Sequence, residues 1–192
     1  MKSDRAIPVN RAPPAGVTAM KGFGLIEQIV TLAILAVLAA AAVPAFAHLL
    51  ARQELAVAQS DYLNALSHAR HLAVNEQVAL LFCPSRDMQR CNADGAWSGG
   101  WLIAHDGGHA GQADGSPWYR GGPYSGRLNI VSSSGQGIRF QTDGTVGNSN
   151  QTLTLCLRHD TAQALSVVIA RRGRVRGSRA TAADAARCAD AD

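Results

Sequence analysis

The chain has 192 residues, of which 47% are hydrophobic and 17% are charged, and its formal net charge is +4. About 145 residues remain once an N-terminal leader and an apolar segment are set aside, which suits one domain and excludes two. The charge is uneven, because five arginines fall within 171–179 while the rest of the chain beyond the leader is net negative. A uniformly basic surface is therefore excluded, and the basic character is local.

The first 22 residues form a polar leader. It contains three prolines and four basic residues against a single acid, namely Pro8, Pro13, Pro14, Lys2, Arg5, Arg11, Lys21 and Asp4. Positive charge beside an apolar helix keeps that end in the cytoplasm, so we expect the rest of the chain to be exported. Residues 1–22 are therefore left out of the fold prediction.

Residues 23–46 form an almost wholly apolar run in which Glu27 is the one charged residue. As a helix, this run is about 36 Å long, which is enough to cross a hydrocarbon core of about 30 Å. A carboxylate in such a helix is costly unless a cation pairs with it. The sequence therefore predicts a transmembrane helix over 23–46 in which Glu27 has a cationic partner.

The start of this run, Gly22-Phe23-Gly24-Leu25-Ile26-Glu27, resembles the class III signal of type IV pilins and type II secretion pseudopilins. The resemblance implies that a prepilin peptidase cuts after Gly22 and methylates Phe23. It also implies that Glu27 pairs with the N-terminal amine of a neighbouring pilin during assembly at the bacterial inner membrane. The family usually has Thr or Ser in place of Gly24. The alternative is an ordinary signal anchor with Glu27 near the membrane interface.

Four cysteines, Cys83, Cys91, Cys156 and Cys188, lie on the exported side. An even number in an oxidising compartment indicates disulfides, and three connectivities are possible. We favour Cys83–Cys91, which closes a short loop, and Cys156–Cys188, which ties the last segment to the sheet. The rival interpretation is a metal site, but spacings of 8, 65 and 32 residues fit no zinc pattern.

The chain after residue 46 begins as an amphipathic helix over 47–76. Its apolar stripe recurs at steps of three and four residues: Leu55, Ala58, Tyr62, Leu66, Ala69 and Ala73. Short β-type runs bounded by Gly, Pro, Asn and Ser follow within 78–179, at 78–82, 100–104, 127–132, 138–141, 153–157 and 166–170. The predicted fold is α+β, with a long N-terminal helix packed on antiparallel β-sheet.

Two segments carry no regular pattern. Residues 105–126 are rich in Gly, Ser and Pro and are predicted to form a long loop, in which Trp118, Tyr119 and Tyr124 either pin the loop to the body or contact a partner. Residues 180–192 are rich in Ala and Asp, and we expect a poorly ordered tail held by Cys188.

Motifs in the second half of the chain resemble the GspH/FimT branch of pilin-like proteins. They are Leu81-Phe82-Cys83-Pro84-Ser85, Trp97-Ser98-Gly99-Gly100-Trp101-Leu102-Ile103, Ile138-Arg139-Phe140-Gln141-Thr142-Asp143-Gly144 and Cys156. With the N-terminal signal, the resemblance covers most of 22–176. It implies a pilin-like domain over 47–192 that lies in the periplasm and is incorporated into a pilus or a pseudopilus.

The candidate binding residues are five arginines: Arg171, Arg172, Arg174, Arg176 and Arg179. In β geometry, Arg172, Arg174 and Arg176 would share one face at a spacing of about 6.6 Å, comparable to that of phosphates along DNA. Arginine also presents a planar bidentate fork to phosphate, and Gly173 and Gly177 let the backbone turn or approach a ligand closely.

Gly173-Arg174-Val175-Arg176 resembles the Gly-Arg-x-Arg motif of the FimT branch, which consists of minor pilins that bind DNA during natural transformation. The resemblance implies that Arg174 and Arg176 bind double-stranded DNA, and we expect Arg171, Arg172 and Arg179 to add electrostatic support. The alternative is a solvated basic turn that keeps the protein soluble or docks acidic pilin partners.

Other candidate sites have little support in the sequence. His68 with His71, or the segment His105-Asp106-Gly107-Gly108-His109, could hold a metal, but each lacks an evident full ligand set. No catalytic constellation stands out, so we expect no enzyme activity and no cofactor. Three functions remain: a filament subunit that also binds DNA, a GspH-like pseudopilin of type II secretion that does not, and a membrane-anchored protein that never polymerises.

Overall fold

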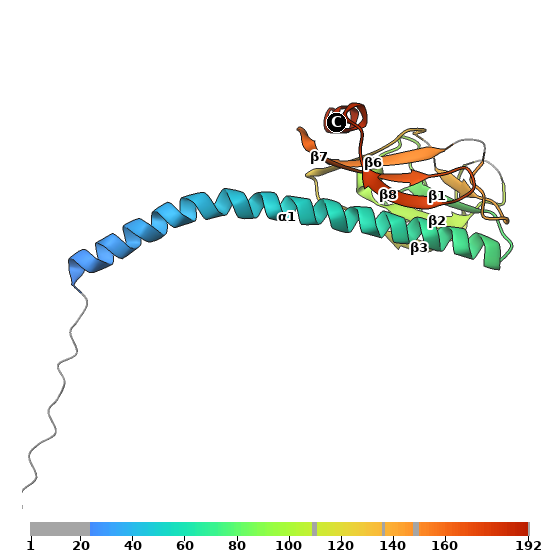
Figure 1. Ribbon diagram of the computed structural model, residues 1–192. Coiled ribbons are helices and arrows are strands. Elements are labelled where there is room, and N and C mark those ends of the chain that lie inside the picture. Colours follow the sequence, from blue (N-terminus) through green and yellow to red (C-terminus); the bar gives the residue numbers. More distant parts are fainter. Residues whose placement is uncertain (1–23, 109–110, 136, 148–149, 192) are drawn as a thin grey trace, which may run out of the picture. The chain divides into compact units, whose positions relative to one another are not determined.

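The computed structural model describes residues 24–108, 111–135, 137–147 and 150–191, apart from the side chain of Pro44. The predicted cleavage residues Gly22 and Phe23 therefore lie outside the described residues. The chain divides into two compact units, one ending at Pro44 and one beginning at Ala45. Helix α1 (Leu25–Asn75) contributes to both units, and each unit is described by itself (Figure 1).

The described part of the first unit is the beginning of α1. Its side chains from Leu25 to Val43 are all exposed, although nearly all of them are apolar. By length and composition, this helix could cross a membrane. An apolar helix that finds no protein partner in its own chain is suited to lipid or to a filament core.

The second unit begins with the rest of α1, which carries the predicted stripe. One face of the helix is buried at regular helical spacing: Leu55, Ala58, Tyr62, Ala65, Leu66, Ala69 and Ala73. The periodicity therefore located the packed face of the helix correctly, and the helix ends at Asn75.

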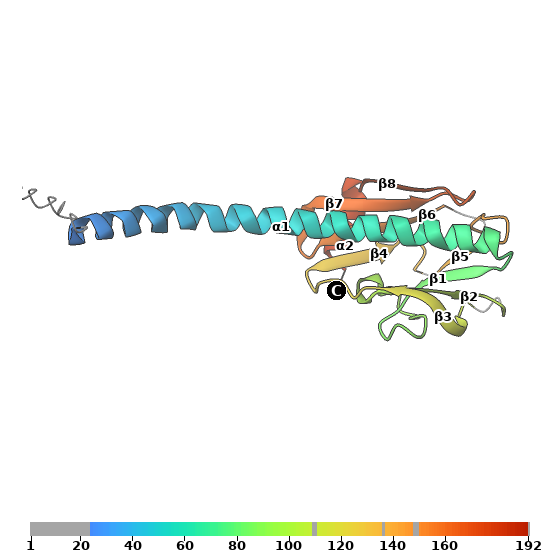
Figure 2. The same ribbon diagram turned by 90° about the horizontal axis from the view of Figure 1, so that it is seen from below.

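The described residues after α1 form eight strands, in two separate antiparallel sheets. The first sheet has the order β3-β2-β1-β5 and consists of β1 (Leu80–Pro84), β2 (Trp101–His105), β3 (Asp114–Gly121) and β5 (Ile138–Phe140). The second has the order β4-β6-β7-β8 and consists of β4 (Leu128–Ser132), β6 (Gln151–Leu157), β7 (Asp160–Ile169) and β8 (Val175–Arg179). In Figure 2 the two sheets lie side by side along α1, with β8 at one outer edge and β3 at the other. The prediction of a long helix on antiparallel sheet is confirmed.

Tyr62 stands at the centre of the core between helix and sheets. Its ring lies 6.0 Å from that of Phe82 on β1 and 5.4 Å from that of Tyr124. Its hydroxyl donates a hydrogen bond of 2.8 Å to the carbonyl oxygen of Trp97, at the start of the 3-10 helix η1 (Trp97–Gly99). Burial raises the pKa of Tyr62 well above the usual value of tyrosine, so the hydroxyl remains a donor at physiological pH.

The predicted loop over 105–126 is wrong in its middle, where β3 pairs with β2 through Ile103 and Tyr119. The Gly, Ser and Pro residues of β3 are typical of loops, so the sequence pattern does not indicate a strand. They are tolerated because β3 is an edge strand. Tyr119 and Tyr124 do pin the segment: the Tyr119 ring meets His68 at 4.5 Å, and the Tyr124 hydroxyl donates to Asp61. Trp118 is 44% exposed.

The expectation of a poorly ordered tail is also wrong, because residues 182–189 form helix α2 (Ala182–Ala189). The Thr181 hydroxyl caps the helix by accepting the N–H of Asp184. Ala185, Cys188 and Ala189 are buried, so the small alanines that looked featureless allow close packing on the sheet.

Both predicted disulfides are present. Cys83–Cys91 closes the loop after β1, and Cys156–Cys188 joins β6 to α2. The second bond therefore fixes the C-terminal helix to the second sheet, and the described residues contain no free cysteine.

The two disulfides should contribute unequally to stability. Their sequence separations are 32 and 8 residues, and loop-closure entropy assigns about 3.7 kcal/mol to the longer loop and about 2.5 kcal/mol to the shorter. We expect Cys156→Ala/Cys188→Ala to lower the free energy of unfolding more than Cys83→Ala/Cys91→Ala. Urea unfolding of a fragment covering residues 45–192 measures both, and the reverse order would contradict the expectation.

Candidate nucleic-acid interface

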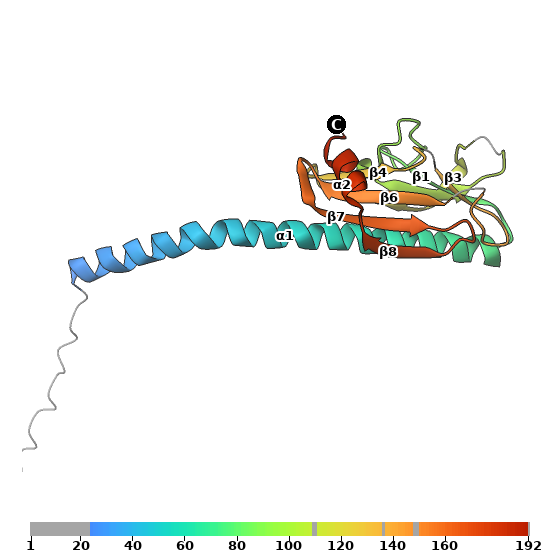
Figure 3. The same ribbon diagram turned by 45° about the horizontal axis from the view of Figure 1, so that its top comes forward.

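The arginine-rich segment forms the turn of the β7–β8 hairpin. Ile169 pairs with Val175, so residues 170–174 make the connection between the strands. The N–H of Ala170 donates to the carbonyl oxygen of Arg174 at 2.9 Å, and the N–H of Gly173 donates to that of Ala170 at 2.7 Å. Figure 3 shows the two strands side by side. The turn is thus closed by its own backbone.

Gly173 is required at this turn for two reasons. Its φ of +77° lies in the left-handed region, which other residues adopt only at a cost. A Cβ at this position would also overlap the carbonyl oxygen of Gly144 and lie 2.8 Å from Nε of Arg70. The turn therefore packs directly on the loop after β5 and on α1.

The connection between β5 and β6, together with helix α1, holds the turn in place. The N–H of Val146 donates to the carbonyl oxygen of Arg171 at 2.8 Å, and the N–H of Arg171 donates to Oδ1 of Asn150 at 2.9 Å. Arg70 of α1 donates from Nε to the carbonyl oxygen of Gly144 at 3.2 Å. The backbone of the arginine turn is consequently fixed, while its side chains reach into solvent.

The predicted row of arginines on one strand face is wrong. Arg172 and Arg174 belong to the turn, and only Arg176 lies within β8. The sequence pattern could not show this, because Gly173 takes a left-handed conformation that breaks the alternation. Arg176 lies on the face of β8 opposite Gly177, where a Cβ would meet Gln59 and Leu63 of α1. Its side chain therefore points away from the helix.

Four arginines thus gather around one turn: Arg171, Arg172, Arg174 and Arg176, which we call the basic turn. All four side chains are exposed, and none forms an ion pair within the part of the chain that the structure describes. Arg70 adds a fifth guanidinium beside them. Sequence reasoning missed Arg70, because it precedes the turn by about a hundred residues and no motif marks it.

Arg179 does not belong to this group. It pairs with Leu165 at the opposite end of β8, about 13 Å along the strand from Val175. Any electrostatic contribution of Arg179 to binding at the turn would have to act over that distance.

One carboxylate lies in the loop that supports the turn. The hydroxyl and the N–H of Thr145 donate to Oδ1 of Asp143 at 2.7 and 2.9 Å, and these bonds lower the pKa of Asp143. The charge is therefore present at neutral pH, but it is directed to Thr145 rather than to an arginine. The surface around the basic turn remains net positive.

Glu27, the predicted assembly residue, lies in the first turn of α1, where its N–H donates to the carbonyl oxygen of Gly24 at 3.1 Å. Its side chain is exposed in the single chain. The geometry leaves the carboxylate accessible to another molecule, and Gly22 and Phe23 lie outside the described residues.

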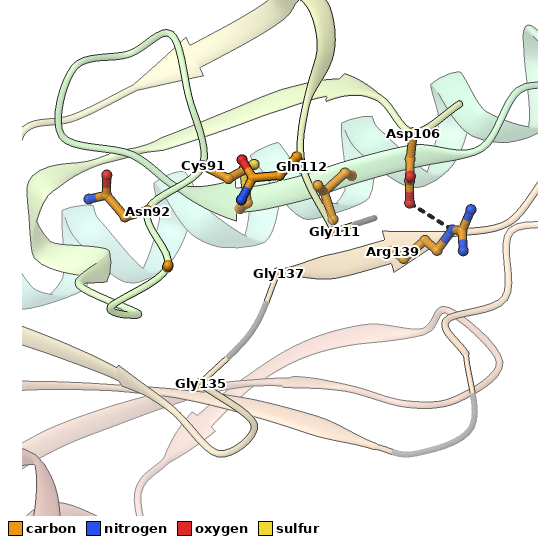
Figure 4. A pocket seen from close by; sticks show the side chains of 11 residues that line it. Cys91, Asn92, Asp106, Gly111, Gln112, Gly135, Gly137 and Arg139 are labelled. Carbon is orange, nitrogen blue, oxygen red and sulfur yellow. Dashed lines mark ion pairs between the residues drawn. A yellow bond between two sulfur atoms is a disulfide. The ribbon is translucent and has the colours of Figure 1, made fainter. Parts of the chain in front are cut away.

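Another hollow lies on the face of the first sheet away from α1 (Figure 4). It has a volume of about 450 Å³ and is lined in part by the Cys83–Cys91 disulfide and by Arg139. Nε of Arg139 pairs with the buried carboxylate of Asp106 at 2.8 Å. Asp106, considered above as a metal ligand, is thus held by an arginine. The described residues contain no group of three or more His, Cys, Asp or Glu side chains that could hold a metal.

A long helix packed on antiparallel sheets, with an N-terminal apolar half, defines a pilin-like subunit. The sequence profile of the family described as type II transport protein GspH matches residues 58–173. The chain belongs to this family, whose members assemble with other pilin-like subunits. No curated protein sequence is significantly similar to the chain.

Solved structures of related shape agree with the fold. Two crystal forms of the type IV minor pilin FimU of Pseudomonas aeruginosa match with TM-scores of 0.56 and 0.51 at 20% and 19% identity. The matches cover 69% and 66% of this chain, and 92% and 93% of the FimU chains. The minor pseudopilin EpsH of Vibrio cholerae matches with a TM-score of 0.48 at 12% identity, over 66% of this chain and 97% of EpsH. At this identity the FimU matches show the shared fold.

The contact between Gly173 and Gly144 predicts a specific weakness. We expect Gly173→Ala to lower the free energy of unfolding by about 2 kcal/mol or more, because it adds an overlap with a backbone carbonyl to the cost of a left-handed φ. Gly115→Ala is the matched control, since Gly115 has a φ of +73° but nothing within 4 Å of its Cβ position. It should cost only about 1 kcal/mol. Equal losses in thermal or urea unfolding would show that the contact is unimportant.

Proposed function

We propose that this pilin-like subunit binds double-stranded DNA through the basic turn and serves DNA uptake by a type IV pilus in natural transformation. The observation that carries the proposal is the gathering of Arg171, Arg172, Arg174 and Arg176 on a fixed turn, exposed and without ion pairs in the described chain. Guanidinium groups without carboxylate partners are free to bind phosphate in their place.

The geometry favours binding to the DNA backbone over reading of bases. The arginines are spread around a short turn, and no described helix or strand protrudes with them to enter a groove. Contacts of this kind position a protein on phosphates and carry no sequence information. The proposed binding is therefore weak, independent of sequence and strongly dependent on salt.

In the same proposal, a prepilin peptidase removes residues 1–22 and methylates Phe23. The apolar half of α1 then crosses the inner membrane once, with the domain after it in the periplasm, and Glu27 pairs with the N-terminal amine of a neighbouring subunit. The exposed apolar helix and the accessible carboxylate in its first turn support this assignment.

The second candidate is a pseudopilin of the type II secretion system that binds no DNA. It is favoured by the description of the matching family, which is that of a transport protein. The basic turn would then dock an acidic surface of another subunit. The two candidates differ in what the isolated domain does, because DNA binding needs no filament.

Titration of labelled double-stranded DNA with residues 45–192 decides between them. We expect Arg174→Gln/Arg176→Gln to reduce the slope of log affinity against log salt concentration by about 1.8, because each lost phosphate contact removes about 0.9. Affinity at low salt should fall for every DNA sequence tested.

The matched control is Arg90→Gln/Arg120→Gln, which removes the same charge from two exposed arginines elsewhere. It should leave the salt slope within experimental error of the wild type. If both double variants weaken binding equally, the effect is one of net charge. If the wild type does not bind at low salt, the pseudopilin function without DNA is the better assignment.

Assembly has its own test. Mass spectrometry of the protein from cells with a functional pilus or secretion system should show a methylated N-terminus at Phe23. We expect Glu27→Gln to leave cleavage intact but to abolish recovery with other pilins after cross-linking, since the substituted side chain carries no charge and cannot form an ion pair with an amine. Glu76→Gln, at an exposed position beyond α1, is the control. An uncut chain, or unchanged recovery of Glu27→Gln, would exclude the proposed assembly.

A further inference from the structure

A groove at the opposite end of β8 from the basic turn has a chemistry of its own. It has a volume of about 380 Å³ and lies between α1, β7 and β8. Arg52 of α1 and Arg179 of β8 line it together, and Nε of Arg52 donates to Oε1 of Gln163 at 3.1 Å. In Figure 3 these three elements run beside one another. Two guanidinium groups therefore flank one hollow.

Apolar side chains form most of the remaining lining: Leu55, Ala56, Ala162, Ala164 and Leu165. No carboxylate is among the described residues that line the groove. The acid nearest to Arg52 in the sequence, Glu54, pairs with Nη2 of Arg127 at 3.0 Å. The carboxylate of Asp160 accepts the N–H of Ala162 at 2.8 Å. The groove thus combines an apolar floor with two arginines that form no ion pair within the described chain.

The groove lies next to the part of α1 whose apolar side chains are not covered by the domain. Phe46, Leu49 and Leu50 are 61%, 49% and 44% exposed, whereas Ala51 begins the buried stripe. Arg52 follows Phe46 by about 9 Å along the helix axis. The polar layer of a bilayer extends roughly 5–7 Å beyond the hydrocarbon on each side. The backbone of Arg52 thus lies just beyond this layer, and its long side chain can reach back to the headgroups.

We propose that Arg52 and Arg179 bind the phosphate group of an anionic phospholipid, and that this contact holds the domain against the membrane surface. A guanidinium fork matches phosphate oxygens, and the apolar floor continues the surface of Phe46 and Leu50 for the first carbons of the lipid. An acidic partner protein could form ion pairs with the two arginines. It would not explain why the apolar floor of the groove continues the exposed apolar surface of α1. The inference rests on the membrane insertion included in the proposed function.

Native mass spectrometry of the full chain released from nanodiscs tests the site. The nanodiscs contain phosphatidylcholine and phosphatidylglycerol in equal amounts, and the measured quantity is the ratio of the two lipids retained. We expect the wild type to prefer phosphatidylglycerol. Arg52→Gln/Arg179→Gln should reduce that preference by about fivefold for each arginine, roughly twenty-five-fold for both. Arg174→Gln/Arg176→Gln removes the same charge at the basic turn and should retain the wild-type ratio.

The outcomes separate the site from the proposed function. A chain that enters nanodiscs but retains both lipids equally, or a groove variant that behaves like the wild type, overturns the lipid site alone. A chain that does not enter nanodiscs overturns the membrane insertion and the lipid site together. Excess glycerol phosphate is added in a further arm, and displacement of the bound lipid by it would show a site for free phosphate instead of a membrane contact.

Discussion

The packing of one face of α1 against two separate sheets is the interaction on which the second unit depends. Phe82 and Ile103 of the first sheet and Leu155 and Val167 of the second belong to the same buried cluster as the helix stripe. A sheet with one apolar face must have that face covered, and here a single helix covers both. Tyr62 ties the helix to the first sheet and to the segments that follow it, since its ring contacts those of Phe82 and Tyr124 and its hydroxyl donates to the carbonyl oxygen of Trp97.

The same packing determines where the arginines lie. Because α1 is fixed on the sheets, Arg70 reaches the carbonyl of Gly144, and the loop containing Gly144 in turn supports Gly173. Three segments that are distant in the sequence thus meet beneath the basic turn. The arginine side chains that could bind phosphate are exposed, but the backbone that carries them is fixed. The close contacts at Gly144 and Gly173 leave no room for a side chain at either position.

Much of the fold was predictable, because its signals are periodic. Spacing and composition indicated the stripe from Leu55 to Ala73 and six of the eight described strands. The two disulfide pairings favoured among three possible connectivities are the ones present. Edge strands β3 and β8 and helix α2 were missed, since edge pairing tolerates Gly and Pro and a short alanine helix derives its order from packing and from Cys188. The prediction that Arg172, Arg174 and Arg176 share one strand face was wrong, because Gly173 has a left-handed conformation that interrupts the alternation of a strand. Arg70 could not be found at all without the tertiary contacts.

The two arginine groups are far apart along α1 but close along β8. Arg52 and Arg70 are 18 residues apart on one helix, which places them about 27 Å apart along the axis. Arg176 and Arg179, by contrast, are three residues apart on β8, which is about 10 Å. This is close to the Debye length of about 8 Å at physiological ionic strength. Added salt therefore screens the two groups from each other, whereas at low ionic strength a polyanion held at the basic turn would compete with an anion bound in the groove.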